Sequence, residues 1–269
     1  MKRLLGLYRE KQYSPGRHKT NDARLLELIA DRLRDRKLDV DLSTIEQSPD
    51  APAATAVVFS MCQGKSSLEI LAHWERQGIN VINSPQAAVN TYRDRLPKLM
   101  LNAGLAFPET QLVGTTGDSL PPFTMDGGLW LKRGDVHASV PSDVQWIDSR
   151  SRLDAGFAEF ASRGIRTAAV QTHQPGDEIK FYGVAGNKFF HWFYPTESSG
   201  FAFDVHALAR LATKAAAAAG LDIFGGDIIV APSGELTLID LNDWPSFAPC
   251  LGPASEAIAN FIAERAYDP

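Results

Sequence analysis

The sequence predicts an α/β fold whose N-terminal third forms a small parallel sheet covered by helices. In that third, short apolar segments alternate with segments of helical periodicity, which is typical of β-α-β connections. The expected strands cover residues 4–8, 40–42, 56–59 and 81–82, and the expected helices cover residues 21–36 and 68–77. The rest of the chain has a different character, because it contains an expected hairpin and two acidic strands.

The helix expected at residues 21–36 carries an apolar stripe. The residues of this stripe are Leu25, Leu26, Leu28, Ile29 and Leu33. At 3.6 residues per turn they share one side of a helix, which favours burial of that side against the sheet. Thr20 or Asn21 is available as the N-cap residue of this helix.

Signals for helices and strands continue to the C-terminus. Further helices are expected at residues 95–103, 207–219 and 255–266, and further strands at residues 128–132 and 167–172. A hairpin is expected from residues 178–184 and 188–194. Gly104 and Gly220 follow two of the helices, and glycine ends a helix without strain because it accepts the left-handed conformation.

Composition excludes several classes of protein. The chain has 269 residues, of which 44% are hydrophobic and 22% charged, as in globular proteins with a large core. The net charge of −5 gives no reason to expect nucleic-acid or membrane binding, and no apolar run is long enough to span a bilayer. The N-terminal apolar run is too short for a signal peptide, and Cys62 and Cys250 match no metal or redox spacing. A cytoplasmic location is therefore expected.

Two adjacent apolar strands near the C-terminus carry the strongest chemical signal. Asp240 and Asn242 are two positions apart, so on a strand they face the same side, and Asp227 lies on the neighbouring strand. Oxygen ligands of this kind suit Mg²⁺, whose octahedron is often completed by nucleotide phosphates. The alternative is that these carboxylates cap turns at strand ends. A carboxylate within an apolar strand, however, is costly unless it is paired or bound to a metal.

Several motifs follow one another in an order that resembles the ATP-grasp superfamily over residues 80 to 250. They are Val81-Ile82-Asn83-Ser84-Pro85, Arg93-Asp94-Arg95, Ala103-Gly104-Leu105-Ala106-Phe107-Pro108-Glu109-Thr110, Leu129-Trp130-Leu131-Lys132, Gln171-Thr172-His173-Gln174-Pro175-Gly176-Asp177-Glu178-Ile179-Lys180, and Asp227 with Asp240-Leu241-Asn242. No single motif is specific, but the ordered set is. It is similar to the carboxylate–amine ligases of the ribosomal-protein-modification and glutathione-synthetase type.

The resemblance implies an ATP-grasp fold with a small N-terminal parallel α/β domain. ATP is then expected between two α+β subdomains that follow this domain. The expected ranges are 1–85 for the N-terminal domain, 86–173 for a central lid subdomain and 174–269 for a C-terminal subdomain with the metal site.

The resemblance also implies sites for the ATP phosphates. Lys132 is expected to bind them, and an ammonium group on an apolar strand needs an anionic partner in any case. Arg95 stands where many relatives have a second phosphate-binding lysine. Lys180 is expected near the γ-phosphate and the acceptor, as a catalytic group beside Lys132. Each residue has an alternative. Lys132 could be a strand-end lysine whose ammonium group reaches water, and Arg95 an exposed arginine at a helix start. Lys180 could form a surface ion pair with Glu178.

The segment between the two subdomains is expected to meet the rest of the nucleotide. The resemblance places Gln171, Thr172 and His173 against adenine, mainly through main-chain groups. It places Glu178 or Asp177 near the ribose or a neighbouring basic residue. The implied cofactors are ATP and Mg²⁺, with Mn²⁺ as the alternative metal.

The acceptor is expected to be a small anionic molecule. Arg17, His18 and Lys19 lie in a basic loop that runs into a helix N-terminus, which suits a carboxylate or a phosphate. His191, Trp192 and Tyr194 of the expected hairpin are candidates for the wall of the acceptor pocket. The alternative for the basic loop is that it is an ordinary solvated loop. The alternative for the hairpin residues is that they form an aromatic cluster that serves packing. The oligomeric state stays open, and a homodimer is compatible with the sequence.

The predicted function is an ADP-forming carboxylate–amine ligase that acts through an acylphosphate. The runner-up is a small-molecule kinase similar to the inositol-phosphate kinases, which phosphorylates a hydroxyl group of an anionic substrate. Asp240, where many ligases of the superfamily have Glu, and the basic N-terminal loop favour the kinase. A nucleotide-binding module without catalysis is the third class, and retention of the metal ligands and Lys132 argues against it.

Overall fold

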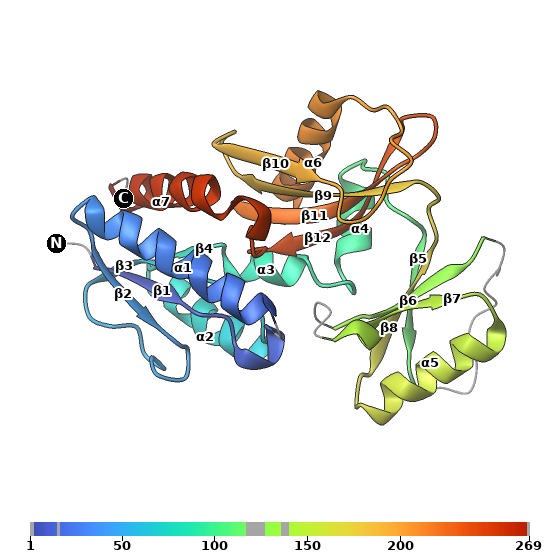
Figure 1. Cartoon of the computed structure of the whole chain (residues 1–269). Coiled ribbons are helices and arrows are strands. Elements are labelled where there is room, and N and C mark those ends of the chain that lie inside the picture. The colour runs from blue at the N-terminus through green and yellow to red at the C-terminus, as the bar shows by residue number, and fades with distance from the viewer. Residues whose placement is uncertain (1–2, 15–16, 117–126, 136–139, 268–269) are drawn as a thin grey trace.

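The computed structural model of the chain describes residues 3–14, 17–116, 127–135 and 140–267. Within these ranges the strands form three four-stranded sheets, which are spread along an elongated molecule (Figure 1). No helix of the described ranges is both long and apolar enough to cross a membrane.

The first sheet, sheet A, is parallel and has the strand order β2-β1-β3-β4. Its strands are β1 (Arg3–Leu7), β2 (Asp39–Ser43), β3 (Thr55–Ser60) and β4 (Asn80–Ile82), and its helices are η1 (Lys11–Tyr13), α1 (Arg17–Asp35), α2 (Lys65–Arg76) and α3 (Pro85–Asn90). Leu4 packs in the core that contains α1, whereas Leu5 packs in the core that contains α2. The two faces are covered by different helices because side chains alternate along a strand. The expected parallel N-terminal sheet is confirmed.

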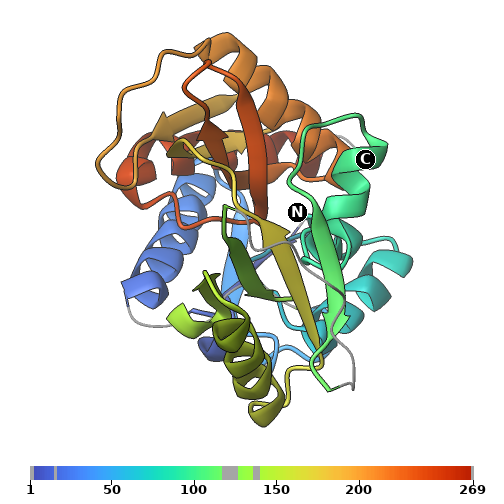
Figure 2. The same cartoon turned by 90° about the vertical axis from the view of Figure 1, so that its right-hand side faces the viewer.

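The second sheet, sheet B, is antiparallel and has the strand order β5-β8-β6-β7. Its elements are β5 (Thr110–Gly114), β6 (Leu129–Arg133), η2 (Pro141–Asp143), β7 (Val144–Ile147), α5 (Arg150–Ser162) and β8 (Thr167–Thr172). Leu129 and Leu131 share a core with Phe157 of α5, which lies against one face of the sheet (Figure 2). The intervening Trp130 and Lys132 therefore point to the other face.

The third sheet, sheet C, is also antiparallel and has the strand order β10-β9-β11-β12. Its strands are β9 (Asp177–Val184), β10 (Phe189–Phe193), β11 (Ile223–Val230) and β12 (Leu236–Asp243), and the helices α4 (Leu96–Asn102) and α6 (Val205–Ala219) cover one face. Phe181 and Ile228 share that core with Leu208 of α6. The opposite face of sheet C is the one that carries the charged residues.

Among the described residues, the sequence prediction missed α3, β5, β7 and α5, besides the short 3-10 helices η1, η2 and η3. The strands β5 and β7 lie at the two edges of sheet B and have only five and four residues, so their apolar alternation is weak. The helix α5 is polar along much of its length, although Leu153, Phe157 and Phe160 form a buried stripe at helical spacing. That stripe is the signal from which α5 was predictable.

A buried joint connects sheet A to sheet C. Asn83, directly after β4, accepts the backbone N–H groups of Asp222 and Ile223 at 2.8 Å each. Its amide nitrogen donates to the carbonyl of Ile223 at 2.6 Å and to Asp243 Oδ1 at 2.5 Å. Trp244 Nε1 donates to the carbonyl of Ile82 at 3.1 Å. These bonds fix the end of β12, and with it the charged face, relative to the N-terminal sheet.

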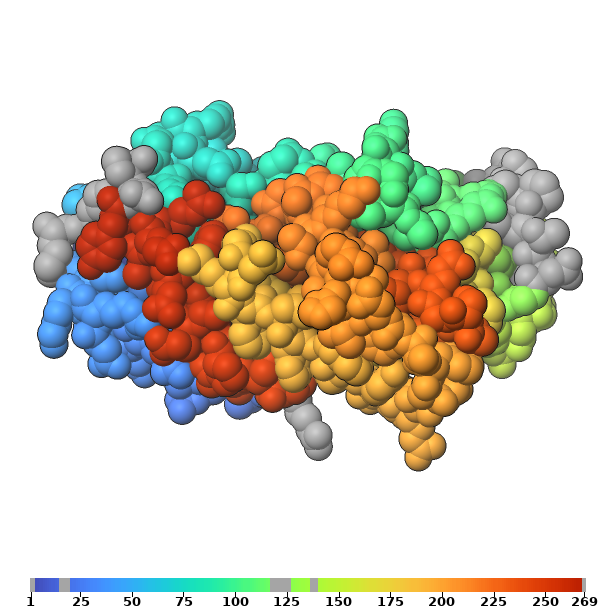
Figure 3. All heavy atoms as spheres, turned by 90° about the horizontal axis from the view of Figure 1, so that it is seen from above, coloured from blue at the N-terminus to red at the C-terminus, as the bar shows by residue number. Residues whose placement is uncertain are grey.

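The last helix, α7 (Leu251–Tyr267), follows η3 (Ala248–Cys250) and shares a core with α1. In Figures 1 and 3 the blue α1 and the red α7 lie side by side, at the end of the molecule away from sheet B. The domain ranges 1–85, 86–173 and 174–269 stay predictions. Each of the three sheets lies within one of them, but α7 packs across the boundary between the last and the first.

We expect Ile258→Ala to lower the free energy of unfolding by about 2–5 kcal/mol, because the isoleucine side chain of α7 is fully buried and its loss leaves a cavity. The measurement is urea unfolding followed by circular dichroism. Leu101→Ala is the control, since Leu101 of α4 is 57% exposed and its removal is expected to cost less than about 1 kcal/mol. Equal losses for the two variants would contradict the assigned packing of α7.

Candidate functional site

The charged face of sheet C gathers acidic and basic side chains from three neighbouring strands. In the strand register, Asp227 of β11 lies opposite Lys180 of β9 on one side and opposite Asp240 of β12 on the other. The ladder between β11 and β12 shifts by one residue so that it skips Ile239. Because of this bulge, Leu238 and Leu241 both pack in the core beside α6, while Asp240 is left on the charged face.

Lys180 lies between two carboxylates on this face. Its Nζ is 2.7 Å from Asp227 Oδ1 and 3.2 Å from Glu178 Oε1. Burial by itself lowers the pKa of Lys180, but the charges of Asp227 and Glu178 outweigh burial and raise it above the usual value. Burial raises the pKa of the Asp227 carboxyl group, and the Lys180 charge opposes that shift. The ammonium group of Lys180 therefore stays charged at neutral pH.

A second group of charges lies where sheet B meets sheet C. Arg93 Nη2 donates to Asp240 Oδ2 at 2.9 Å, and both side chains are about nine-tenths buried. Lys132 of sheet B is 7% exposed, and its Nζ donates to Gln171 Oε1 at 2.6 Å. Burial, with a contribution from the Arg93 charge, lowers the pKa of Lys132 to about 8, against the Asp240 charge, which raises it. A buried lysine whose hydrogen bond goes to a neutral amide would be stabilised by an anionic partner, because a buried charge is costly without one.

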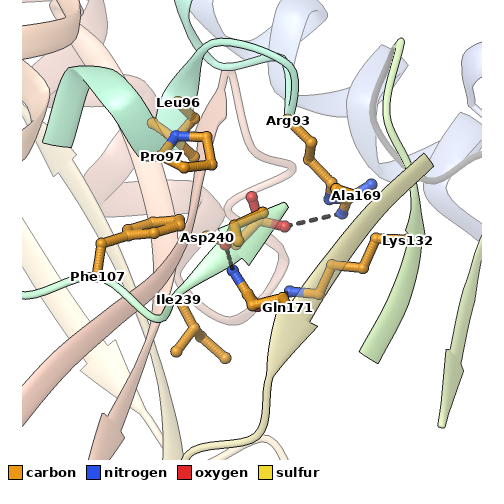
Figure 4. A pocket seen from close by; sticks show the side chains of 10 residues that line it. Arg93, Leu96, Pro97, Phe107, Lys132, Ala169, Gln171, Ile239 and Asp240 are labelled. Atoms are coloured by element: carbon orange, nitrogen blue, oxygen red, sulfur yellow. Dashed lines mark hydrogen bonds and ion pairs between the residues drawn. The ribbon is translucent and has the colours of Figure 1, made fainter. Parts of the chain in front are cut away.

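These residues line one pocket, shown in Figure 4. Its lining consists of Arg93, Leu96, Pro97, Phe107, Thr110, Lys132, Ala169, Gln171, Ile239 and Asp240. Arg93 reaches into it from the loop before α4, Lys132 and Gln171 come from sheet B, and Asp240 comes from sheet C. The pocket therefore combines two cations, one carboxylate and an apolar wall between two sheets.

No protein-family model matches the sequence, and no curated protein matches it. Solved structures do match over nearly the whole length. A RimK domain protein ATP-grasp from Sphaerobacter thermophilus DSM 20745 has a TM-score of 0.68 at 18% identity, with 97% of this chain and 99% of that chain covered. The chain has the ATP-grasp fold. A D-alanine–D-alanine ligase from Bacillus anthracis, complexed with ATP, has a TM-score of 0.71 at 12% identity, with 99% and 97% covered. The ATP-grasp ligase PsnB, complexed with a minimal precursor, Mg and ADP, has a TM-score of 0.63 at 14% identity, with 98% of each chain covered.

The ATP-grasp fold predicted from the ordered motifs is thus confirmed, including the small parallel N-terminal sheet. Of the predicted site residues, the fold brings together Lys132, Gln171 and Asp240 in the pocket. Glu178, Lys180, Asp227 and Asn242 lie beside them on the charged face of sheet C. What these residues bind stays a prediction.

Arg95 lies outside this group, because it is the exposed N-cap residue of α4. Arg93, two positions earlier, is the arginine in the pocket, and the sequence prediction did not single it out. Both residues belong to the motif Arg93-Asp94-Arg95. The motif therefore indicated that a basic residue of this segment enters the site. Which arginine enters depends on the direction of the chain at the start of α4.

The expected adenine segment lies at the end of β8. The N–H of Thr172 donates to the carbonyl of Glu109 at 3.0 Å, and that of His173 to the carbonyl of Gly128 at 3.3 Å. The His173 ring accepts a hydrogen bond at Nδ1 from Trp130 Nε1 at 3.3 Å and packs edge-to-face on Trp146, with ring centroids 5.0 Å apart. Burial lowers the pKa of His173. The two tryptophans were not among the predicted site residues, although Trp130 stands two positions before Lys132 and so shares its face.

The residues predicted for the acceptor are distributed over different surfaces. His191 of β10 lies opposite Tyr182, on the face of sheet C that carries Lys180. Tyr194 instead packs with Trp192 and Phe203 in the core on the α6 side. Arg17, His18 and Lys19 form the first turn of α1, and their side chains lie outside the part that the structure describes.

The donor atoms of Asp227, Asp240 and Asn242 fit a hard cation such as Mg²⁺. Asp227 and Asp240 lie directly opposite each other on adjacent strands, and Asn242 follows on the same face. Within the described residues, no group of three or more His, Cys, Asp or Glu side chains is arranged to hold a metal ion, and the predicted set contains only two such residues. In the structure Asp227 is paired with Lys180, and Asp240 with Arg93.

We expect the unfolding free energy to fall as the pH rises from about 4 to about 7, because of Asp243. Burial raises the pKa of its carboxyl group to about 7, and the hydrogen bond from Asn83 opposes the shift only in part. The folded chain thus holds a proton that the unfolded chain releases, so stability decreases through this window, by at most about 1.4 kcal/mol per pH unit, and levels off above it. The measurement is urea unfolding at several pH values without divalent cations.

Asp243→Asn is expected to reduce that dependence, since the amide oxygen keeps the bond from Asn83 and the asparagine side chain does not ionise. Asp154→Asn, at an exposed ion pair with Arg150, is the control and should keep the slope of the unchanged chain. A slope that persists in Asp243→Asn would show that another group causes it.

Proposed function

We propose that the chain is a Mg²⁺- and ATP-dependent ligase that forms ADP. The observation that carries the proposal is the pocket, in which the buried Lys132 and Arg93 face the carboxylate of Asp240, with Asp227 next to it. Such a site offers cations for phosphate groups and carboxylates for the metal that neutralises those groups. The similar structures support this, because the D-alanine–D-alanine ligase is complexed with ATP, and PsnB with Mg and ADP.

Each group has a role in this proposal. Lys132 and Arg93 bind the ATP phosphates. Asp227, Asp240 and Asn242 would hold a Mg²⁺ ion, which would supply positive charge to neutralise the phosphates. Lys180 stabilises the negative charge that develops as the γ-phosphoryl group moves. The adenine and ribose of ATP are proposed to contact Gln171, Thr172, His173 and Glu178. Arg95 is left out because of its exposure.

The proposed reaction has two steps. A substrate carboxylate attacks the γ-phosphoryl group in line, giving an acylphosphate and ADP, and an amine then displaces phosphate. Catalysis rests on positioning and charge, so no side-chain nucleophile is required. The acceptor is proposed to be a small anionic molecule bound near Lys180 and His191, which share one face of sheet C. A cytoplasmic location agrees with two free, buried cysteines.

A small-molecule kinase is the second candidate. It is favoured by Asp240, because aspartate holds the metal closer to the strand than the glutamate of many ligases does. The kinase shares the ATP site and the metal and differs in the acceptor, which is a hydroxyl group, and in stopping after phosphoryl transfer.

One experiment separates the candidates. The purified chain is incubated with Mg-ATP and a small-metabolite extract, and ADP and free phosphate are measured in parallel, with an ATP-only background and an Asp240→Ala control. ADP matched by extract-dependent phosphate supports the ligase. ADP without matching phosphate supports the kinase. ATP binding that survives Asp240→Ala, with no turnover in any extract, would leave a nucleotide-binding module.

A further inference from the structure

Arg93 forms an ion pair with Asp240, one of the carboxylates that the proposed function assigns to the metal. Both oxygens of Asp240 are engaged, because Oδ2 accepts Arg93 Nη2 at 2.9 Å and Oδ1 accepts the backbone N–H of Leu241 at 3.0 Å. The pair is nine-tenths buried, so water screens the guanidinium charge poorly. A divalent cation at Asp240 and the guanidinium group in its present position would repel each other strongly.

The guanidinium group also has unused donor capacity. Arg93 Nε is buried and has no hydrogen-bond partner among the described residues, while Nη1 makes only a long contact of 3.4 Å to the carbonyl of Arg133. Buried N–H groups are rarely left without a partner. A guanidinium group with free donors beside Lys132 is well suited to two oxygens of a phosphate, since its planar fork binds phosphate in a bidentate manner.

We propose that Arg93 couples nucleotide binding to metal binding: it holds Asp240 while the pocket is empty and moves to the nucleotide phosphates, which frees Asp240 for the metal. This inference rests on the proposed function and adds a positioning role for a residue of this chain. The carboxylate of Asp240 is then paired in both states of the chain: with Arg93 in the absence of nucleotide, and with the cation once nucleotide is bound. The cost of an unpaired buried charge is thereby avoided.

The coupling predicts effects of opposite sign on two separate equilibria. Removing the Arg93 charge is expected to strengthen metal binding in the absence of nucleotide, because Asp240 loses its competitor. The same change is expected to weaken nucleotide binding in the absence of metal, because a phosphate contact is lost. A residue that only maintained the structure would weaken both.

The test uses Arg93→Gln in the full chain. Binding of Mn²⁺ alone is measured by the electron paramagnetic resonance signal of the free ion, and binding of ATP in EDTA by calorimetry. We expect Mn²⁺ to bind about ten-fold more tightly than to the unchanged chain, and ATP about ten-fold more weakly. Thermal unfolding and circular dichroism establish that the variant is folded, and Arg93→Met, which also removes the charge and keeps a long side chain, is used for the same comparison if it is not.

Three controls make the outcome specific. Lys132→Gln removes a positive charge from the same pocket but leaves the Arg93–Asp240 pair, so its gain in Mn²⁺ affinity should be clearly smaller. Arg95→Met, at the exposed arginine, should change neither equilibrium. The double variant Arg93→Gln with Asp240→Asn should lose the Mn²⁺ gain.

Unchanged or weaker Mn²⁺ binding in folded Arg93→Gln, or unchanged ATP binding, overturns the coupling. If the unchanged chain binds no ATP at all, the proposed function fails instead. The Mn²⁺ measurement still decides in that case whether Arg93 withholds Asp240 from a cation.

Discussion

Lys132→Met is expected to weaken ATP binding by about 10- to 100-fold while leaving the fold as stable as before or more stable. Lys132 is buried, and the hydrogen bond that the structure shows for its Nζ goes to the neutral amide of Gln171. Charge-assisted hydrogen bonds contribute about 1.5–3 kcal/mol, which corresponds to the expected loss of affinity. The stability effect has the opposite sign, because methionine fills a similar volume without a charge to bury.

The pH dependence of this stability difference follows from the pKa of Lys132. Burial lowers that pKa to about 8, below the usual value of lysine, so the unfolded chain binds more protons than the folded chain between about 8 and 10.5. The cost of burying the charge is fully present below pH 8 and disappears as the pH rises through this window. The advantage of Lys132→Met should therefore be largest at neutral pH and vanish near pH 10.5.

The measurements are calorimetric ATP titration and urea unfolding at pH 7 and pH 10. Lys98→Met is the matched control, because Lys98 of α4 is exposed and its loss should change neither quantity. Undiminished ATP binding by Lys132→Met would remove the main support for the nucleotide site. A large loss of stability at pH 7 would show that the lysine is structural.

Asp227→Asn is expected to reduce Mg²⁺-dependent ADP formation by about 100- to 10,000-fold, because an amide would replace the carboxylate that we propose as a metal ligand, with little change of shape. Asp227 is preferred to Asp240 for this test, since Lys180 keeps its second carboxylate, Glu178, at 3.2 Å, whereas Arg93 would lose its ion pair. Binding of ATP in EDTA should be unchanged or stronger, because a negative charge near the phosphates is removed.

The readout for Asp227→Asn is the rate of ADP formation as a function of Mg²⁺ concentration. A shift of half-saturation to higher Mg²⁺, together with a lower maximum, is the expected pattern. Glu235→Gln, an exposed carboxylate in the turn between β11 and β12, should leave both values unchanged. Turnover that is insensitive to Asp227→Asn would exclude this aspartate from metal binding.

Much of the site was predictable because the relevant signals are local. The alternation of side chains along a strand places Lys132 on the face of sheet B opposite to α5, and places Asp240 away from the core of sheet C. The pairing of Asp227 with Asp240 across a short turn follows from the hairpin that connects their strands. The bulge at Ile239 was not predictable, since it arises from fitting Leu238 and Leu241 into one core.

The sequence by itself determined the ATP-grasp fold and the strands that carry Lys132, Lys180, Asp227 and Asp240, because strand alternation and motif order depend on neighbouring residues. Only the tertiary structure decided that Arg93 rather than Arg95 enters the pocket and that Tyr194 packs away from the charged face. Arg93 and Asp240 are separated by 147 positions, so their pairing depends on how the loop before α4 is held against sheets B and C. Contacts between residues so far apart in the sequence depend on the packing of the whole chain, which cannot be predicted from a local sequence pattern.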